Sequence, residues 1–255
     1  MPLDIALFPA LDDNFGYLVR DAGSGRVAAI DAPEEAPILA ELDKRGWTLT
    51  DILITHHHPD HTDAIAPLKR RFGVQVTGPR GEAGKIAGLD TLVAGGDTVS
   101  LGETRFEVID VPGHTLGHIA YFFPADNVLF SADALFSLGV GRMFEGSPEP
   151  MWQGLERLKA LPPETQIYCG HEYTLSNAKF ALSVDPDNSA LQARAEEVQR
   201  QLDAGRPTIP VTLASELAAN PFLRADTPEL ARAMSLPGAP AWQVFGALRK
   251  AKDNF

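Results

Sequence analysis

Histidine is concentrated in three short segments of this 255-residue chain, which contains seven histidines in all. Four of them lie in the run Thr55–His61, with the sequence T-H-H-H-P-D-H. Two more, His114 and His118, belong to the segment G-H-T-L-G-H, and His171 belongs to C-G-H-E. Imidazole and carboxylate groups together are suitable ligands for zinc, iron and manganese. The three segments therefore predict a metal site.

The first segment has the spacing of a ligand loop. In an extended chain alternate side chains point the same way, so His56 and His58 can reach one ion while His57 points elsewhere. Asp60 and His61 then stand at the start of a helix and can reach a second ion. A solvated or hydrogen-bonded structural cluster is the alternative interpretation. The pattern H-x-H-x-D-H, bounded by a strand and a helix, favours metal binding.

More ligands are needed than this loop supplies. His114 and His171 each follow a predicted strand and stand beside a glycine. Asp133 follows the predicted strand 127–131, and its carboxylate could bridge two cations, although a turn or helix-capping role would explain an isolated aspartate equally well. His118 opens an apolar strand, for which we expect an inward structural role.

Each of these segments follows a predicted strand, at the strand ends where α/β proteins present functional groups. Strand patterns cover residues 15–19, 26–30, 51–55, 74–77, 98–101, 105–111, 118–123, 127–131 and 166–169. Helix patterns cover residues 33–45, 63–72 and 150–160, followed after Tyr173 by 188–204, 227–234 and 241–252. The change from α/β to helical patterns predicts a catalytic domain of residues 1–172 and a helical domain of residues 173–255.

Composition limits the classes of protein. Hydrophobic residues make up 44% of the chain and the formal net charge is −12, which is typical of a globular protein and argues against a general nucleic-acid binder. The single cysteine, Cys169, lies in a predicted buried strand and is expected to be a core residue. No signal peptide or long apolar run is evident, so we expect a cytoplasmic protein with no membrane association and no obligate protein partner.

The motifs T-H-H-H-x-D-H, G-H-T-x-G-H, a lone aspartate after an apolar strand, and G-H-E-Y occur in the order of the metallo-β-lactamase superfamily, which this chain resembles. Within that superfamily the whole chain resembles the hydroxyacylglutathione hydrolase (glyoxalase II) family. The resemblance extends from D-N-F-G-Y at 13–17 to R-K-A-K-D-N-F at 249–255, and includes N-P-F-L-R at 220–224. It implies an αββα sandwich followed by a helical domain.

The resemblance also implies two divalent metal ions per chain, with zinc expected first and iron or manganese as alternatives. It places His56, His58 and His114 on one ion, Asp60, His61 and His171 on the other, and Asp133 between them. Asp60 and Asp133 would have catalytic roles as well. The mixed imidazole and carboxylate ligands do not select one metal.

For the substrate, the resemblance implicates five positions, namely Arg142, Phe144, Tyr173, Arg249 and Lys252. Arg142 stands where many relatives have lysine, and it keeps the positive charge. Phe144 stands where they have tyrosine and cannot donate a hydrogen bond. The last fifteen residues contain three basic side chains and one acidic side chain, which suits an anionic ligand. A basic helix end stabilised by the helix dipole would give the same composition.

The implied reaction is hydrolysis of a glutathione thioester, with S-lactoylglutathione as the expected substrate and lactate and glutathione as products. A mononuclear-iron persulfide dioxygenase is one alternative, and Asp60, His61 and His171 together argue against it. A β-lactamase or lactonase is disfavoured by the helical tail, residues 173–255. A nuclease is disfavoured by the net charge. A non-enzymatic metal-binding scaffold is disfavoured by the number of converging ligands.

Overall fold

The computed structural model describes residues 3–255, and it divides into two compact units. Unit 1 comprises the described residues up to Asp110 together with Thr115–Phe130, and unit 2 comprises Val111–His114 and Ser131–Phe255. The predicted division at residue 172 separates the chain by sequence pattern and remains a prediction. The two compact units do not follow this division, because part of the α/β region packs with the helical tail in unit 2.

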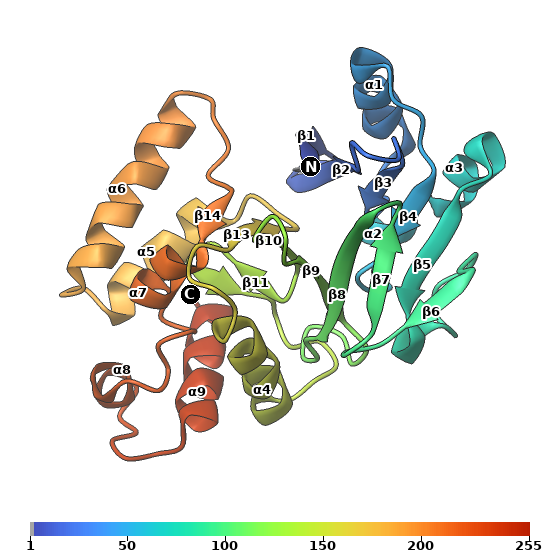
Figure 1. Cartoon of the computed structure of the whole chain (residues 1–255). Helices are drawn as coiled ribbons and strands as arrows, with labels where there is room; N and C mark the ends of the chain where they lie inside the picture. Colours follow the sequence, from blue (N-terminus) through green and yellow to red (C-terminus); the bar gives the residue numbers. More distant parts are fainter. Residues whose placement is uncertain (1–2) are drawn as a thin grey trace. The chain divides into compact units, whose positions relative to one another are not determined.

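Unit 1 contains a six-stranded sheet in the order β1-β2-β3-β4-β5-β6. The first three strands are antiparallel, and the pairs from β3 to β6 are parallel. Parallel neighbours need crossover connections, and α1 and α3 provide two of them (Figure 1). The strands are β1 (Asp4–Ala10), β2 (Asn14–Arg20), β3 (Val27–Ile30), β4 (Asp51–Leu53), β5 (Gln75–Pro79) and β6 (Thr91–Val93). The helical elements are α1 (Glu35–Arg45), α2 (Pro59–Thr62), α3 (Ile65–Phe72) and the 3₁₀ turn Arg80–Glu82.

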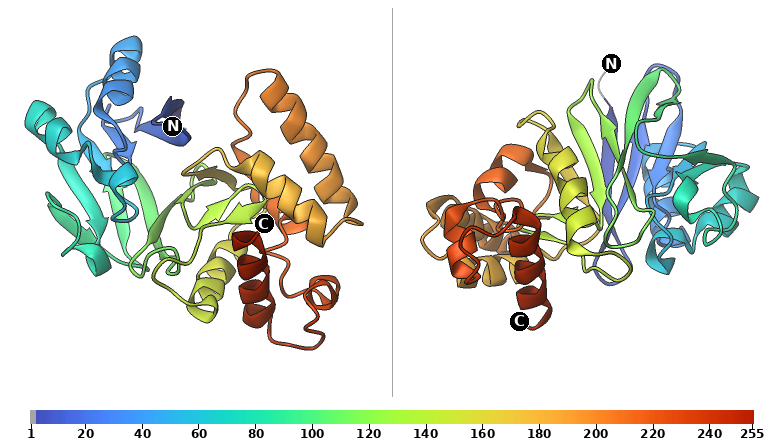
Figure 2. Two further views of the ribbon diagram at one scale, coloured as in Figure 1. Left: turned by 180° about the vertical axis from the view of Figure 1, so that it is seen from behind. Right: turned by 90° about the horizontal axis from the view of Figure 1, so that it is seen from below.

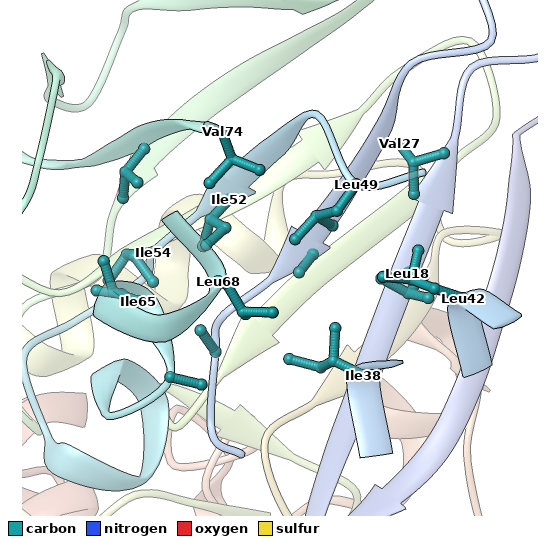
Figure 3. Packing of buried hydrophobic residues seen from close by; sticks show 14 of the residues in the cluster. Leu18, Val27, Ile38, Leu42, Leu49, Ile52, Ile54, Ile65, Leu68 and Val74 are labelled. Atoms are coloured by element: carbon teal, nitrogen blue, oxygen red, sulfur yellow. The ribbon is translucent and has the colours of Figure 1, made fainter. Parts of the chain in front are cut away.

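One face of this sheet packs against α1 and α3. Figure 3 shows Ile38 and Leu42 of α1 and Leu68 of α3 directed toward side chains of the strands. These residues belong to one buried cluster, which also contains Leu18 and Ile52. The cluster fixes the strands whose ends carry the histidine loop.

The other face of the sheet meets a second, antiparallel set of strands. Side chains alternate along β2, so Tyr17 points away from Leu18, and its ring lies 5.3 Å from that of Phe130. Tyr121 donates a hydrogen bond of 2.6 Å to the carbonyl of Ile54. This set has the order β10-β9-β8-β7 and comprises β7 (Thr98–Leu101), β8 (Thr104–Asp110), β9 (Ile119–Phe123) and the start of β10 (Val128–Ala132). Unit 1 thus has a helix layer and two sheet layers.

Unit 2 contains the end of β10 and is mainly helical. The strand order β14-β13-β10 gives it a small sheet, and β11 pairs with β12 in a hairpin. Helix α4 packs against α9, and α5 against α6 (Figure 2). The elements are β11 (Leu135–Phe136), β12 (Gly139–Val140), α4 (Pro148–Lys159), β13 (Gln166–Cys169), α5 (Thr174–Val184), α6 (Ser189–Asp203), β14 (Val211–Thr212), α7 (Leu213–Ala219), α8 (Pro228–Ala233) and α9 (Ala241–Asp253).

The strands and helices predicted from the sequence are present, with ends that differ by a few residues. Gly46, which directly follows α1, adopts a left-handed conformation with φ of 65°, as is common for a glycine that ends a helix. The sequence patterns did not indicate β1, β6, the two-residue strands, α5 or α7. None of the helices among residues 3–255 has the length and apolar character required to cross a membrane.

Candidate functional site

The histidine loop of unit 1 begins at the carboxyl end of β4. Because β3 and β4 are parallel, with Ile30 opposite Leu53, the residues that follow the two strands meet at one edge of the sheet. Asp31 follows β3 directly, and its carboxylate accepts hydrogen bonds from Thr55 N (2.8 Å), Thr55 Oγ1 (2.9 Å) and His61 Nδ1 (2.7 Å). Asp31 therefore fixes both the start of the loop and the ring of His61.

The imidazoles of the loop are oriented by these hydrogen bonds. His56 Nδ1 lies 3.0 Å from Thr55 Oγ1, which itself donates to Asp31, so the histidine nitrogen is the donor. His61 likewise uses Nδ1 for Asp31. The Nε2 atoms of His56 and His61 thereby keep their lone pairs, as a metal ligand requires. His56 Nε2 and His58 Nδ1 lie 3.1 Å apart, close enough to bind one ion.

Asp60 lies in the short helix α2 and its side chain is about one-third exposed. Its Oδ2 is 3.4 Å from His61 Nε2. The buried Asn14 amide donates to both Asp60 O (3.1 Å) and Asp60 Oδ2 (3.2 Å). Asn14 belongs to the D-N-F-G-Y motif, so a physical role of that motif is to hold the Asp60 carboxylate.

His57 points to a different partner, as the alternation of the loop predicts. Its Nδ1 donates to Glu82 Oε2 at 2.9 Å. The other carboxylate oxygen of Glu82 accepts from the Thr115 hydroxyl and from Gly117 N. The buried Glu82 carboxylate therefore joins the histidine loop to Thr115 and Gly117 of the G-H-T-L-G-H segment through three hydrogen bonds.

Unit 2 brings Asp133, His114 and His171 together. Asp133 Oδ2 lies 3.4 Å from His114 Nε2 and 3.3 Å from His171 Nε2. Two atoms that bind one zinc ion at about 2.0–2.1 Å in tetrahedral geometry lie about 3.3–3.4 Å from each other. The three side chains are buried, and both the spacing and the donor types fit a divalent metal ion.

The backbone around Asp133 is closely packed. Asp133 occupies a turn between β10 and β11, after Ala132, which has a positive φ of 41°. His114 Nδ1 donates to the carbonyl of Arg142 at 3.0 Å, which leaves Nε2 directed at Asp133. A side chain at Gly141 would overlap the carbonyl oxygen of Asp133, so glycine is required for this close approach.

All five predicted substrate residues belong to unit 2. The exposed ring of Phe144 lies 5.2 Å from the His114 ring, and Tyr173 stacks on His171 at 4.8 Å. Arg142 is exposed, with Nε 3.9 Å from Asp253 Oδ1. The structure thus places Phe144 and Tyr173 against two candidate ligands.

The two basic residues of α9 differ in environment. Arg249 is only 4% exposed, and it donates to Val140 O at 2.8 Å and pairs with Asp253 at 3.0 Å. Lys252 Nζ donates to the carbonyl and hydroxyl oxygens of Ser176. Burial lowers the pKa of Lys252, and the positive charges of Arg249 and Arg142 lower this pKa further. A direct contact between Arg249 and a substrate remains a prediction.

The two residues expected to be structural are buried. His118 is 1% exposed and stacks on the His56 ring at 4.6 Å, in agreement with an inward role. Cys169 is fully buried, and burial raises the pKa of its thiol to about 12. A thiol with that pKa is a poor nucleophile at neutral pH, which agrees with its assignment as a core residue.

Sequence reasoning missed Asp31, Glu82 and Asn14 as residues that orient the site. Each is an ordinary polar residue when viewed alone. One available signal for Asp31 was its place directly after a buried strand that precedes the histidine strand. Its φ of 57° is unusual for a residue other than glycine, asparagine or aspartate, and it becomes visible only in the structure.

We expect Asp31→Asn to weaken metal binding by about 10- to 100-fold, the usual effect of removing a hydrogen-bond partner of a ligating histidine. Asparagine has the same shape and tolerates a positive φ, but its amide cannot accept all three hydrogen bonds. Zinc retained against a competing chelator would measure the effect. Asp12 is exposed, and Asp12→Asn is the control variant, which should retain zinc like the wild type. Equal zinc retention in the two variants would contradict the role of Asp31.

Two known family patterns together match residues 13–255. The pattern of the metallo-beta-lactamase superfamily matches residues 13–171, and that of the hydroxyacylglutathione hydrolase C-terminus matches residues 172–255. The crystal structure of ETHE1 from Myxococcus xanthus shares the fold, with a TM-score of 0.68, 24% identity and full coverage of both chains. TTHA1623, solved in a di-iron-bound form, has a TM-score of 0.56 and 30% identity over 66% of this chain and 91% of its own.

The similarity to curated relatives is more specific. A hydroxyacylglutathione hydrolase of Rhodopseudomonas palustris is 54% identical over 254 residues, which cover 100% of both chains. This chain belongs to the hydroxyacylglutathione hydrolase family of the metallo-β-lactamase superfamily. The fold expected from the sequence, an α/β metallo-β-lactamase fold followed by a helical region, is confirmed.

Proposed function

We propose that this protein hydrolyses a glutathione thioester, with S-lactoylglutathione as its main substrate. The family membership supports a hydroxyacylglutathione hydrolase activity. The observation that carries the proposal is the link between the ligand cluster and the basic residues in unit 2. The carbonyl of Arg142 holds His114, while the guanidinium of Arg142 lies near Asp253, beside Arg249. An anionic glutathione moiety would meet positive charge next to the reacting centre.

For the metal we propose two divalent ions per chain, with zinc as the first choice and iron or manganese as alternatives. TTHA1623, which was solved with two irons, supports the iron alternative. The ligands would be His56, His58, Asp60, His61, His114, Asp133 and His171. When bound, such ions supply an activated water and stabilise the negative charge that develops on the thioester oxygen.

The protein residues complete the chemistry. We propose that Asp60, held by Asn14, orients the attacking water, and that Asp133 holds both ions in place. The leaving group is a thiolate whose thiol has a pKa of about 8.5, so no strong general acid is required. Cys169 is buried and protonated, and is therefore not a competing nucleophile.

We also propose the division into a catalytic part, residues 1–172, and a substrate-binding helical part, residues 173–255. Phe144 and Tyr173 would contact the substrate through their exposed ring surfaces. ETHE1 shares the fold at 24% identity, which supports no shared reaction. A cytoplasmic location, and the lack of nucleic-acid, membrane or obligate protein partners, remain predictions from the sequence.

A panel of thioesters tests this function. Steady-state hydrolysis should be fastest with S-lactoylglutathione, slower with other acylglutathiones, and weak with the matching lactoyl thioester of N-acetylcysteamine, which lacks the glutathione carboxylates. Equal kcat/KM for the glutathione and N-acetylcysteamine thioesters would show that the basic residues do not recognise glutathione. Hydrolysis of none of the thioesters would contradict the proposed activity.

We expect Lys252→Ala to raise KM about tenfold or more and to leave kcat nearly unchanged. A charge-assisted hydrogen bond is worth roughly 1.5–3 kcal/mol, and an interaction that is equal in ground and transition states changes KM alone. Lys252→Arg should restore most of the affinity. Lys250→Ala, an exposed neighbour on the same helix, is the matched control.

The pH dependence of KM provides a second measurement of Lys252. Because its pKa is lowered from 10.5, the ammonium loses its proton at a lower pH than an ordinary lysine. KM of the wild type should therefore rise at alkaline pH, beginning below pH 10.5. Lys252→Arg should remove this rise, since arginine stays charged. An unchanged KM in Lys252→Ala would mean that the residue only stabilises the helix end.

A further inference from the structure

A short hairpin in unit 2 is held by side chains from the helical tail. It consists of β11, the turn Ser137–Leu138, and β12, and lies near α5, α7 and α9 (Figures 1 and 2). Two-residue strands have little stability of their own. The tail binds four consecutive backbone positions: Asn177 Nδ2 donates to Ser137 O (3.1 Å), Glu216 Oε2 accepts from Leu138 N (2.8 Å), Asn220 Nδ2 donates to Gly139 O (3.1 Å), and Arg249 Nη1 donates to Val140 O (2.8 Å).

Glu216 is the centre of this network. It is fully buried, and besides Leu138 N it accepts from Ser137 Oγ at 3.0 Å and from Asn220 Nδ2 at 2.9 Å. Leu138 has a φ of 57°, a left-handed conformation that a leucine adopts only at some cost. The carboxylate thus holds a strained turn in one conformation.

The two ends of the hairpin lead to candidate metal ligands. Asp133 stands two residues before β11, and Arg142 stands two residues after β12. The carbonyl of Arg142 accepts the hydrogen bond that orients His114. Gly141 lies so close to the carbonyl of Asp133 that no side chain would fit. A shift of the hairpin would therefore move Asp133 and release the ring of His114.

We propose that Glu216 and Asn220 are positioning residues, through which the helical tail sets the geometry of Asp133 and His114 by way of the β11–β12 hairpin. This gives the tail a second role beside substrate binding, and assigns a task to the asparagine of the N-P-F-L-R motif. The inference rests on the proposed metal centre, but does not depend on which thioester is hydrolysed.

Glu216→Gln in the full-length chain tests the proposal. Glutamine has one acceptor oxygen in place of two and cannot accept from Ser137, Leu138 and Asn220 together. Cobalt-loaded protein reports the geometry around the metal through its visible absorption bands. We expect the bands to shift, a chelator to remove cobalt at about tenfold lower concentration, and kcat at saturating metal to fall about tenfold, within the range known for residues behind metal ligands.

Asn188→Ala is the control for a loss of stability alone. Asn188 caps α6 by accepting hydrogen bonds from Ala190 N and Leu191 N. Its amide donates to Asp185 and to Ala218 O, and none of these partners belongs to the hairpin. This variant should lower the melting temperature while leaving the cobalt bands, cobalt retention and kcat within twofold of the wild type. A purely structural role of Glu216 would give the same pattern in both variants.

Ser137→Ala removes the hydroxyl that donates to Glu216 and accepts from Arg194 Nη2. It leaves the bonds of Glu216 to Leu138 N and Asn220 in place, and provides a milder variant should Glu216→Gln fail to fold. It should shift the cobalt bands in the same direction with a smaller loss of kcat. The inference is overturned if Glu216→Gln folds and has unchanged cobalt bands and unchanged kcat. If Glu216→Gln does not fold, the same result for Ser137→Ala overturns it. Wild-type protein that binds no cobalt would instead overturn the proposed metal centre, so the two failures are distinguishable.

Discussion

Asp133→Ala is expected to lose both metal ions, or to lower kcat/KM by at least about 1,000-fold, which corresponds to about 4 kcal/mol of transition-state stabilisation. One Asp133 oxygen lies within 3.4 Å of the Nε2 atoms of both His114 and His171. Removal of this carboxylate leaves two imidazoles without the group that is proposed to join the two metal sites.

Metal content per chain and steady-state hydrolysis of S-lactoylglutathione measure this effect. Circular dichroism should show that the variant is folded, because alanine fits the turn after Ala132. Asp187→Ala replaces an exposed aspartate of the same unit and should retain both ions and full turnover. If Asp133→Ala retains two ions and near-normal kcat, the bridging role is wrong.

Removal of residues 185–255 is expected to abolish both turnover and stable metal binding. The deleted segment supplies β14, which pairs with β13 through Ile167 and Val211. It also supplies Glu216, Asn220 and Arg249, three of the four tail side chains that bind the backbone at Ser137–Val140. Phe245, which packs near Trp152 of α4, is lost as well. The remaining part of unit 2 would expose apolar surface and lose the support of its ligand cluster.

The proposed division at residue 172 concerns the roles of the two parts. A catalytic part that also folded independently would respond differently to the same truncation. If residues 1–172 fold independently, the shortened chain keeps its metal ligands and loses only glutathione recognition. Metal analysis, circular dichroism and turnover of the shortened protein distinguish the two outcomes. A folded, metal-loaded and fully active truncation would contradict both the substrate role of the tail and its support of the hairpin.

The candidate ligand residues could be selected from the sequence because each stands near the end of a strong strand pattern. The sheet order then determines which strand ends meet, as it does for Asp31 and Thr55 beside His61. The partners of the ligands could not be predicted in this way. Asp31 contacts His61 across thirty residues, and nothing in the local pattern around an aspartate after a strand indicates that contact.

The contacts made by side chains of the helical tail could not be predicted from the sequence either. The resemblance implicated Arg249 and Lys252, and the helix pattern over residues 241–252 contains both. Neither the resemblance nor the pattern could show that the guanidinium of Arg249 turns inward to Val140 O. That partner belongs to a strand of two residues, which is too short to have a recognisable pattern. Glu216 and Asn220 likewise acquire their roles from a turn that only the folded chain creates.

The most direct measurement is the turnover of S-lactoylglutathione as metal-free protein is loaded with increasing zinc. We expect kcat/KM to rise until two ions are bound per chain and then to stay constant, and we expect no such rise in Asp133→Ala. Full turnover with one ion per chain, or no hydrolysis of the glutathione thioester at any zinc content, would contradict this expectation.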